Sequence, residues 1–163
     1  MDKNGVLCTL SDARLRQIEG TPNLLAELVE ARMDSDVPGL LDLADTWDAL
    51  DCLLSDRGRD AVMGDAILAR TGRTLAASTA HGPARVLLPE RVVLVSTALG
   101  RLPRDVVRIR FPSLNGKTIH GDYGQDRTPN EREIQTVARS LTRVSSVYAR
   151  AAAAGHGMLC ALV

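Results

Sequence analysis

The chain has 163 residues with 20 acidic and 20 basic side chains, so its formal net charge is zero. A chain of this length suits one domain and can bury enough surface to fold without a disulfide or a metal. No apolar run approaches the ~18 residues of a membrane span, the amino terminus does not resemble a secretory signal, and the three cysteines form no CxxC motif. We therefore expect one cytoplasmic domain over residues 1–163, with reduced thiols and no membrane contact.

Charge is unevenly distributed along the chain. Residues 1–65 hold 14 acidic and 6 basic side chains, whereas residues 66–163 hold 6 acidic and 14 basic ones. Either the two halves fold against each other so that their fields cancel, or the surface is bipolar and attracts a charged partner. The near-neutral pI argues against nucleic-acid binding, which typically requires a clearly basic domain.

The first third of the chain predicts one strand and then helices. Residues 6–10 form a β-type run, and Ser11 after it is a preferred N-cap for a helix that Gly20 ends. Residues 41–54 predict a further helix, because large apolar side chains recur there at helical spacing. These side chains are Leu43, Trp47, Leu50 and Leu54. The spacing indicates that Trp47, the single tryptophan, is a core anchor.

The rest of the chain alternates irregular and regular segments. Residues 71–83 show no period and are expected to form a loop, whereas residues 84–88 predict a strand and Pro89 begins a helix. A capping box at residues 128–131 begins a long helix that Gly155 ends, and the apolar residues 158–163 predict a strand covered on both faces. Together these elements predict an α+β fold with one small mixed or antiparallel sheet, which contains the N- and C-terminal strands and is packed by several helices.

Several of these segments resemble one bacterial family. The run Trp47-Asp48-x-Leu50-x-x-Leu53-Leu54 resembles a signature of the YfbM-like proteins, a bacterial family of unknown function. The first strand, residues 82–92 and the closing helix and strand match the family in the same order. Two positions depart from it: Asp51 replaces a histidine of the signature, and Ser55-Asp56 replaces a Thr-Gly. The resemblance implies an α+β fold in a soluble bacterial protein and implies no activity.

Carboxylates recur every third residue in the segment around Trp47, at Asp42, Asp45, Asp48 and Asp51. Neighbouring pairs lie one helical turn apart, so they could hold a metal or divide acid and base roles. A solvated helix face explains the same pattern, and no histidine lies in the segment. The three histidines show no metal-ligand spacing with each other or with a cysteine. We assign no catalytic residue, metal or cofactor.

Residues 112–127 form the longest irregular segment and contain the best polar cluster, His120, Asp122 and Tyr123. A base, an acid and a phenol within four residues could serve proton transfer, or could form a turn whose polar groups bond locally. If this loop folds over the Trp47 helix, it would complete a polar pocket with Trp47, Asp48 and Asp51. An enzyme or a small-ligand-binding protein is the function that such a pocket indicates.

Arginines form one face of the C-terminal helix, at Arg132, Arg139, Arg143 and Arg150. This face could bind phosphates or an acidic partner, or could simply be solvated. Since no convergent catalytic set is present, our leading hypothesis is a protein that binds another protein, for example an immunity or antitoxin-type protein that neutralises a toxin. The binding residues would be Asp45, Asp48, Asp51, His120, Asp122, Tyr123, Arg132, Arg139 and Arg143. The small-ligand or enzyme hypothesis is the alternative.

Overall fold

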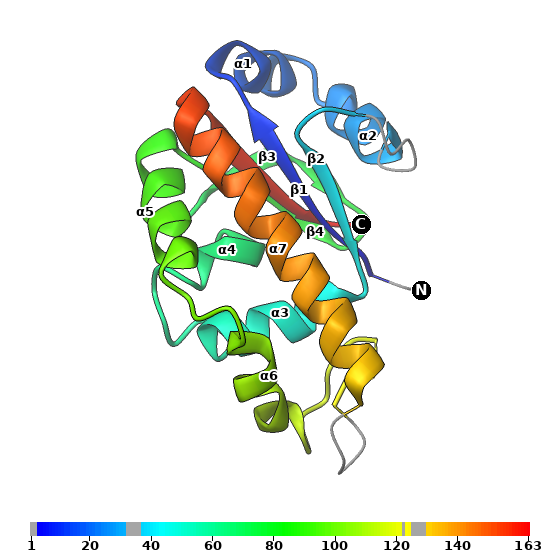
Figure 1. Cartoon of the computed structure of the whole chain (residues 1–163). Helices are drawn as coiled ribbons and strands as arrows, with labels where there is room; N and C mark the ends of the chain where they lie inside the picture. The colour runs from blue at the N-terminus through cyan, green and yellow to red at the C-terminus, as the bar shows by residue number, and fades with distance from the viewer. Residues whose placement is uncertain (1–2, 32–36, 122, 125–129) are drawn as a thin grey trace.

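The computed structural model describes residues 3–31, 37–121, 123–124 and 130–163, and it contains one five-stranded antiparallel sheet with the order β2-β1-β5-β4-β3 (Figure 1). The expected α+β fold is confirmed, with the N- and C-terminal strands in one sheet and a long C-terminal helix. The elements are β1 (Gly5–Leu10), α1 (Asp12–Gly20), α2 (Asn23–Glu30), β2 (Leu40–Ala44), α3 (Thr46–Ser55), α4 (Asp65–Leu68), β3 (Arg73–Thr79), β4 (Gly82–Leu87), α5 (Pro89–Gly100), α6 (Val106–Arg110), η2 (Phe111–Leu114), α7 (Glu131–Ala154) and β5 (Gly157–Leu162).

The closing strand β5 is the middle strand of the sheet. It pairs antiparallel with β1 on one side and with β4 on the other, and its first five residues are buried. A strand covered on both faces tolerates an unbroken apolar sequence, since neither face meets water. The expectation of a central closing strand is therefore confirmed.

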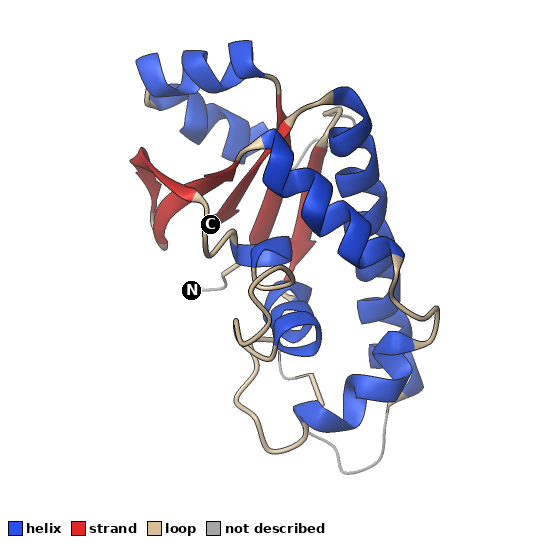
Figure 2. Ribbon diagram, turned by 90° about the vertical axis from the view of Figure 1, so that its left-hand side faces the viewer, coloured by secondary structure: helices blue, strands red, loops and turns tan. Residues whose placement is uncertain are grey.

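Helices cover both faces of the sheet (Figure 2). Helices α1 and α2 pack on one face, over a core that includes Cys8 and Leu159. Helices α3 to α7 cover the other face, over a larger core that includes Leu7 and Cys160. Adjacent strand residues belong to opposite cores because successive side chains of a strand point to opposite faces. The buried thiols of Cys8 and Cys160 therefore lie on opposite faces of the sheet.

The expected helix over residues 41–54 is wrong at its start. Residues 40–44 form β2, an edge strand paired with β1, and α3 begins only at Thr46. Leu41 and Leu43 are buried while Asp42 between them is not, which is the two-residue period of a strand. From Trp47 onwards the apolar spacing does belong to a helix. Leu43 lies in the strand, and its distance from Trp47 in the sequence fits the helical period by coincidence.

The expected loop over residues 71–83 is also wrong. Strands β3 and β4 form an antiparallel hairpin there, with a register shift between Thr74 and Ser78. Alternation along β3 is weak because only Leu75 is fully buried. Pairing with β4 holds this segment extended, and its own sequence gives little indication of a strand.

The long helix α7 ends as expected, with Gly155 in the left-handed conformation. Its start differs from the expected capping box. The side chain of Asn130 accepts the backbone N–H of Arg132 at 3.0 Å, so Asn130 is the N-cap. The expected cap residues Thr128 and Pro129 lie outside the described residues.

A buried polar network joins three helices of the larger core. Asp65 at the start of α4 is fully buried, and its Oδ2 accepts Nε–H of Arg91 on α5 at 2.5 Å. Thr71 donates its backbone N–H and its hydroxyl to the same carboxylate, and the Tyr148 hydroxyl of α7 donates to the Asp65 carbonyl. Among helices of the described residues, none combines the length and the apolar character that a membrane crossing requires.

Candidate functional site

The turn from β2 into α3 positions the acidic side chains of the candidate site. Ala44 has a φ of 48°, and its backbone N–H donates to Asp42 Oδ1 at 2.7 Å. The Thr46 hydroxyl donates to the Leu43 carbonyl at 2.6 Å. A non-glycine residue in the left-handed region is strained, so this turn persists because its surroundings impose it. The chain thereby changes direction at the end of the sheet and presents Asp45 and Asp48 there.

Trp47 is both a core anchor and part of the site. Its side chain is 9% exposed, belongs to the larger core and packs against Gly5. The indole N–H donates to the Lys3 carbonyl at 2.9 Å, so the buried ring keeps its one polar group bonded. The other side of Trp47 contacts the His120 ring, with centroids 5.9 Å apart. The core position expected from the helical spacing is correct.

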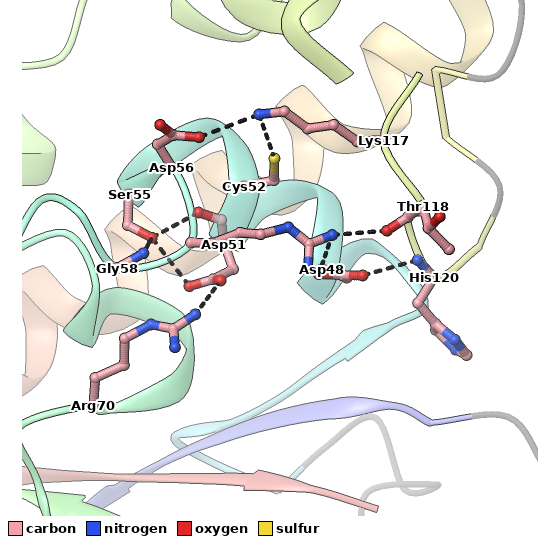
Figure 3. A network of polar contacts seen from close by, with 11 residues as sticks. Asp48, Asp51, Cys52, Ser55, Asp56, Gly58, Arg70, Lys117, Thr118 and His120 are labelled. Carbon is pink, nitrogen blue, oxygen red and sulfur yellow. Dashed lines mark hydrogen bonds and ion pairs between the residues drawn. The ribbon is translucent and has the colours of Figure 1, made fainter. Parts of the chain in front are cut away.

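The segment after η2 is tied to α3 by a row of polar contacts (Figure 3). Lys117 Nζ donates to Cys52 Sγ at 3.3 Å and to Asp56 Oδ1 at 3.2 Å. One residue further along, Arg57 donates to the Thr118 carbonyl at 2.7 Å. These contacts place the segment along α3 and bring its last residues to the amino-terminal end of that helix.

Asp48 completes this row. Its Oδ2 accepts the backbone N–H of His120 at 2.9 Å, and its Oδ1 lies 3.9 Å from Arg57. The Asp48 side chain is only 13% exposed, so both contacts act on a carboxylate that is largely removed from water. A residue of α3 thus fixes the backbone of His120.

Asp45 and Tyr123 form the second contact between the turn and the loop. The Tyr123 hydroxyl donates to Asp45 Oδ1 at 2.9 Å. Burial raises the pKa of Tyr123 above its ordinary value, and the hydrogen bond to the carboxylate raises it further. Gly121 makes the approach possible, because with a φ of +83° a Cβ there would lie 2.9 Å from Asp45 Oδ2. Tyr123 is therefore a hydrogen-bond donor and is not available as a phenolate.

His120 is likewise engaged as an acceptor. Its Nε2 accepts the backbone N–H of Lys3 at 3.2 Å, so this nitrogen carries a lone pair. In a neutral imidazole the other nitrogen, Nδ1, then bears the proton and can donate. A general base needs a free lone pair within reach of the substrate proton, and the only one on this ring already accepts a backbone hydrogen bond.

A cavity of about 860 Å³ opens between the turn, the amino-terminal segment and the loop. Its volume lies within the roughly 300–1,000 Å³ of small-molecule sites. Its lining residues are Lys3, Asn4, Ala44, Asp45, Trp47, Asp48, Thr118, Ile119, His120 and Gly121. The expected loop and helix therefore do meet around a polar cavity with an aromatic wall.

The remaining candidate residues lie elsewhere. Asp51 is 1% exposed and does not line the cavity, because its carboxylate accepts Arg70 at 2.5 Å and the Ser55 hydroxyl at 3.2 Å. Burial raises the pKa of Asp51 even though Arg70 opposes that shift. Asp122 lies outside the described residues. Arg132, Arg139 and Arg143 are exposed on α7 and do not line the cavity.

The sequence did not predict the part played by Lys3 and Asn4, which line the cavity, or by Arg57, which lies beside Asp48 without lining it. Lys3 supplies a backbone N–H and a carbonyl, and Arg57 holds the loop beside Asp48. Backbone groups leave no trace in side-chain patterns, and Arg57 falls in a segment that looked like a simple helix end. Within the described ranges, no group of three or more His, Cys, Asp or Glu side chains could hold a metal ion.

Comparison with known proteins identifies the family. The family model described as "Domain of unknown function (DUF1877)" matches residues 1–161. The chain belongs to the DUF1877 family. The DUF1877 fold recurs in the crystal structure of YfbM from Escherichia coli, a protein of unknown function, with a TM-score of 0.73 and 17% sequence identity over 98% of this chain and 99% of that one. The resemblance to YfbM-like proteins is thus confirmed. No curated protein matches the sequence.

Proposed function

We propose that this DUF1877 protein binds a small ligand with a cationic group in the cavity beside Trp47. The observation that carries the proposal is the pairing of an aromatic wall, Trp47 and His120, with the carboxylate of Asp45 in one cavity. Aromatic faces attract cations through their quadrupole, and a neighbouring carboxylate adds charge and a hydrogen-bond acceptor.

The carboxylate of Asp45 supports a cationic ligand. Asp48 already has Arg57 at 3.9 Å, whereas Asp45 forms no ion pair within the part of the chain that the structure describes. The neutral Tyr123 hydroxyl donates to Asp45 Oδ1, which leaves Oδ2 able to accept from a ligand. A primary ammonium or a guanidinium would compensate this charge.

The same contacts favour binding over catalysis. The lone pair of His120 Nε2 accepts a backbone N–H, and the raised pKa of Tyr123 keeps that phenol protonated. Neither group can accept a substrate proton without first losing its present contact. Asp45 and Asp48 are then ligand-binding and loop-positioning groups.

Trp47 provides the assay, since it is the single tryptophan of the chain and lines the cavity. We expect agmatine, spermidine or another small organic cation to change Trp47 fluorescence, and Asp45→Asn to weaken that response about tenfold. Glu27→Gln, an exposed carboxylate on α2 at the other face of the sheet, is the control and should leave the response unchanged. Equal responses of wild type and Asp45→Asn to every cation would refute the proposal.

A second candidate is binding of a protein with an acidic surface by α7, as an immunity or antitoxin-type protein would bind a toxin. It is supported by the exposure of Arg132, Arg139 and Arg143, none of which forms an ion pair with the described residues. The test is affinity purification from the native host with wild type and with Arg132→Glu, Arg139→Glu and Arg143→Glu combined. A stoichiometric partner that only the wild type retains is expected. Recovery of no such partner would count against this candidate.

A further inference from the structure

A second cavity, of about 200 Å³, lies at the ends of β4 and β5 on the sheet face that carries α4. It shares no lining residue with the cavity beside Trp47. Its lining residues are Leu68, Arg70, His81, Gly82, Pro83, Arg85, Cys160, Ala161 and Leu162. Three of them are Arg or His and none is acidic, so the surface of this cavity is basic.

Arg85 lies on the same side of the sheet as the cavity floor. It is the register partner of Cys160, and side chains directly opposite each other on paired strands share one face. One guanidinium nitrogen of Arg85 donates to the Arg70 carbonyl at 2.8 Å. Over the described ranges no carboxylate pairs with Arg85, so its charge and its other N–H groups are not compensated by an acidic side chain.

Arg70 also lines the cavity. It follows Ala69, whose φ of 45° ends α4, and its side chain extends toward α3 (Figure 3). One nitrogen donates to the buried Asp51 carboxylate at 2.5 Å. A guanidinium has five N–H donors in a planar fork, so a single contact of this kind leaves donors for a ligand. The side chain of Arg70 is 37% exposed.

The charges around this cavity do not balance. Two guanidinium groups face one carboxylate, that of Asp51, and the imidazole of His81 adds a further donor. Such a site attracts an anion, and guanidinium forks match the oxygens of phosphate in pairs. The volume is below the roughly 300–1,000 Å³ of sites that enclose a whole small molecule, which fits a single charged group.

We propose that the cavity between Arg70, His81 and Arg85 binds a phosphate group. The site is independent of the cation site beside Trp47, since the two cavities share no lining residue.

The test is titration of the whole chain with inorganic phosphate at constant ionic strength, followed by amide chemical shifts in NMR spectra and by the melting temperature. In the wild type we expect the amide shifts to concentrate at residues 70, 81–85 and 160–162. Arg85→Gln should bind phosphate about tenfold more weakly, since it loses a charge-assisted contact. Arg101→Gln, an exposed arginine at the end of α5, is the matched control and should bind like the wild type.

Three outcomes would overturn the proposal. They are equal phosphate affinity in Arg85→Gln and wild type, phosphate-induced shifts centred on the arginines of α7, and saturation of the same amides by acetate at the same concentration. The last outcome would assign the cavity to carboxylates. His81→Ala keeps the test decisive if Arg85→Gln fails to fold, because it removes a second donor without touching the Arg70 carbonyl.

Discussion

Asp48 and His120, 72 residues apart in the chain, are joined by a hydrogen bond of 2.9 Å from the His120 backbone N–H to the Asp48 carboxylate. The neighbouring tie between Lys117 and Asp56 is largely exposed and contributes little to stability. The Asp48 carboxylate is mostly buried, so its contact with the His120 N–H is worth more. We conclude that this bond holds the loop against α3 and keeps the cavity beside Trp47 in shape.

Replacing Asp48 should loosen that loop. In Asp48→Ala we expect a loss of about 1–3 kcal/mol in the free energy of unfolding, because a hydrogen bond to a charged group is removed and a backbone N–H loses its partner. Hydrogen exchange at residues 117–121 should become faster. Asp56→Ala is the matched control, and its exchange rates at 119–121 should stay unchanged. Equal protection of these amides in Asp48→Ala and wild type would contradict the assignment.

Two arginine–carboxylate pairs allow the effect of burial on stability to be compared with the effect of hydrogen-bond geometry. Arg91 contacts the fully buried Asp65 at 2.5 Å, whereas Arg108 contacts the half-exposed Glu131 through two bonds of 2.6 and 2.8 Å. Arg91→Met should destabilise the fold by about 3–5 kcal/mol, because it leaves a buried charge unpaired. Arg108→Met should change the urea midpoint far less, since exposed pairs are screened. Similar losses in both variants would argue against burial as the cause.

Gly5 is required by the close packing of β1 against α3. A Cβ at Gly5 would lie 2.5 Å from Trp47 Cβ, whereas a Cβ at Gly20 would meet no atom within 4 Å. We expect Gly5→Ala to lower the free energy of unfolding by about 1–3 kcal/mol through overpacking. Gly20→Ala, at the last residue of α1, should raise it by about 0.5–1 kcal/mol. Chemical denaturation of both variants checks the pair, and an unaffected Gly5→Ala would exclude the clash.

Alkaline pH should destabilise the protein through its buried thiols. Burial raises the pKa of Cys8 from 9.0 to about 11 and that of Cys160 to about 12. Above pH 9 the unfolded chain loses these protons while the folded state retains them, so stability is complete below pH 9 and is lost as pH rises further. For Cys8 the loss between pH 9 and 11 is about 3 kcal/mol. The melting temperature of the wild type should therefore fall more steeply above pH 9 than that of Cys8→Ala, and parallel curves would contradict this.

Elements with strong local signals could be predicted from the sequence. Helix α7 has a regular apolar stripe. Gly155 ends this helix in the left-handed conformation, which favours glycine. Strand β5 is apolar at almost every position, which predicted its central place. In both elements the local sequence pattern agrees with the tertiary environment, so the pattern alone was enough to predict the element and its position.

Elements that depend on distant pairing could not be predicted. The edge strand β2 is five residues long and continues into α3 within two residues, so Leu43 fits both periods. The β3–β4 hairpin has one fully buried side chain on β3, and pairing with β4 supplies the rest of its order. The hydrophobic period of such a short segment cannot distinguish a strand from a helix or a loop. Pairing with the partner strand decides which of these structures forms.

The candidate site was likewise predicted only in part. The small-ligand hypothesis required the loop to fold over the Trp47 helix, and Asp48, His120 and Tyr123 do lie at such a contact, together with Asp45. Asp51 was grouped with them because it shares their three-residue spacing. A step of three residues on a helix advances about 300°, so each member is rotated by about 60° from the one before it, and Asp51 contacts Arg70 instead of the cavity.

The central place of β5 also dictates an order of assembly. The pair β2–β1 and the pair β4–β3 do not touch each other within the sheet, and β5, which follows both in the chain, is the strand that joins them. Contacts such as Leu7 with Cys160 span nearly the whole sequence. Loops of that length are slow to close, so we expect the inner edges of the β2–β1 and β4–β3 pairs to stay open until β5 pairs with both. During that interval the chain is at its most vulnerable to association through those edges.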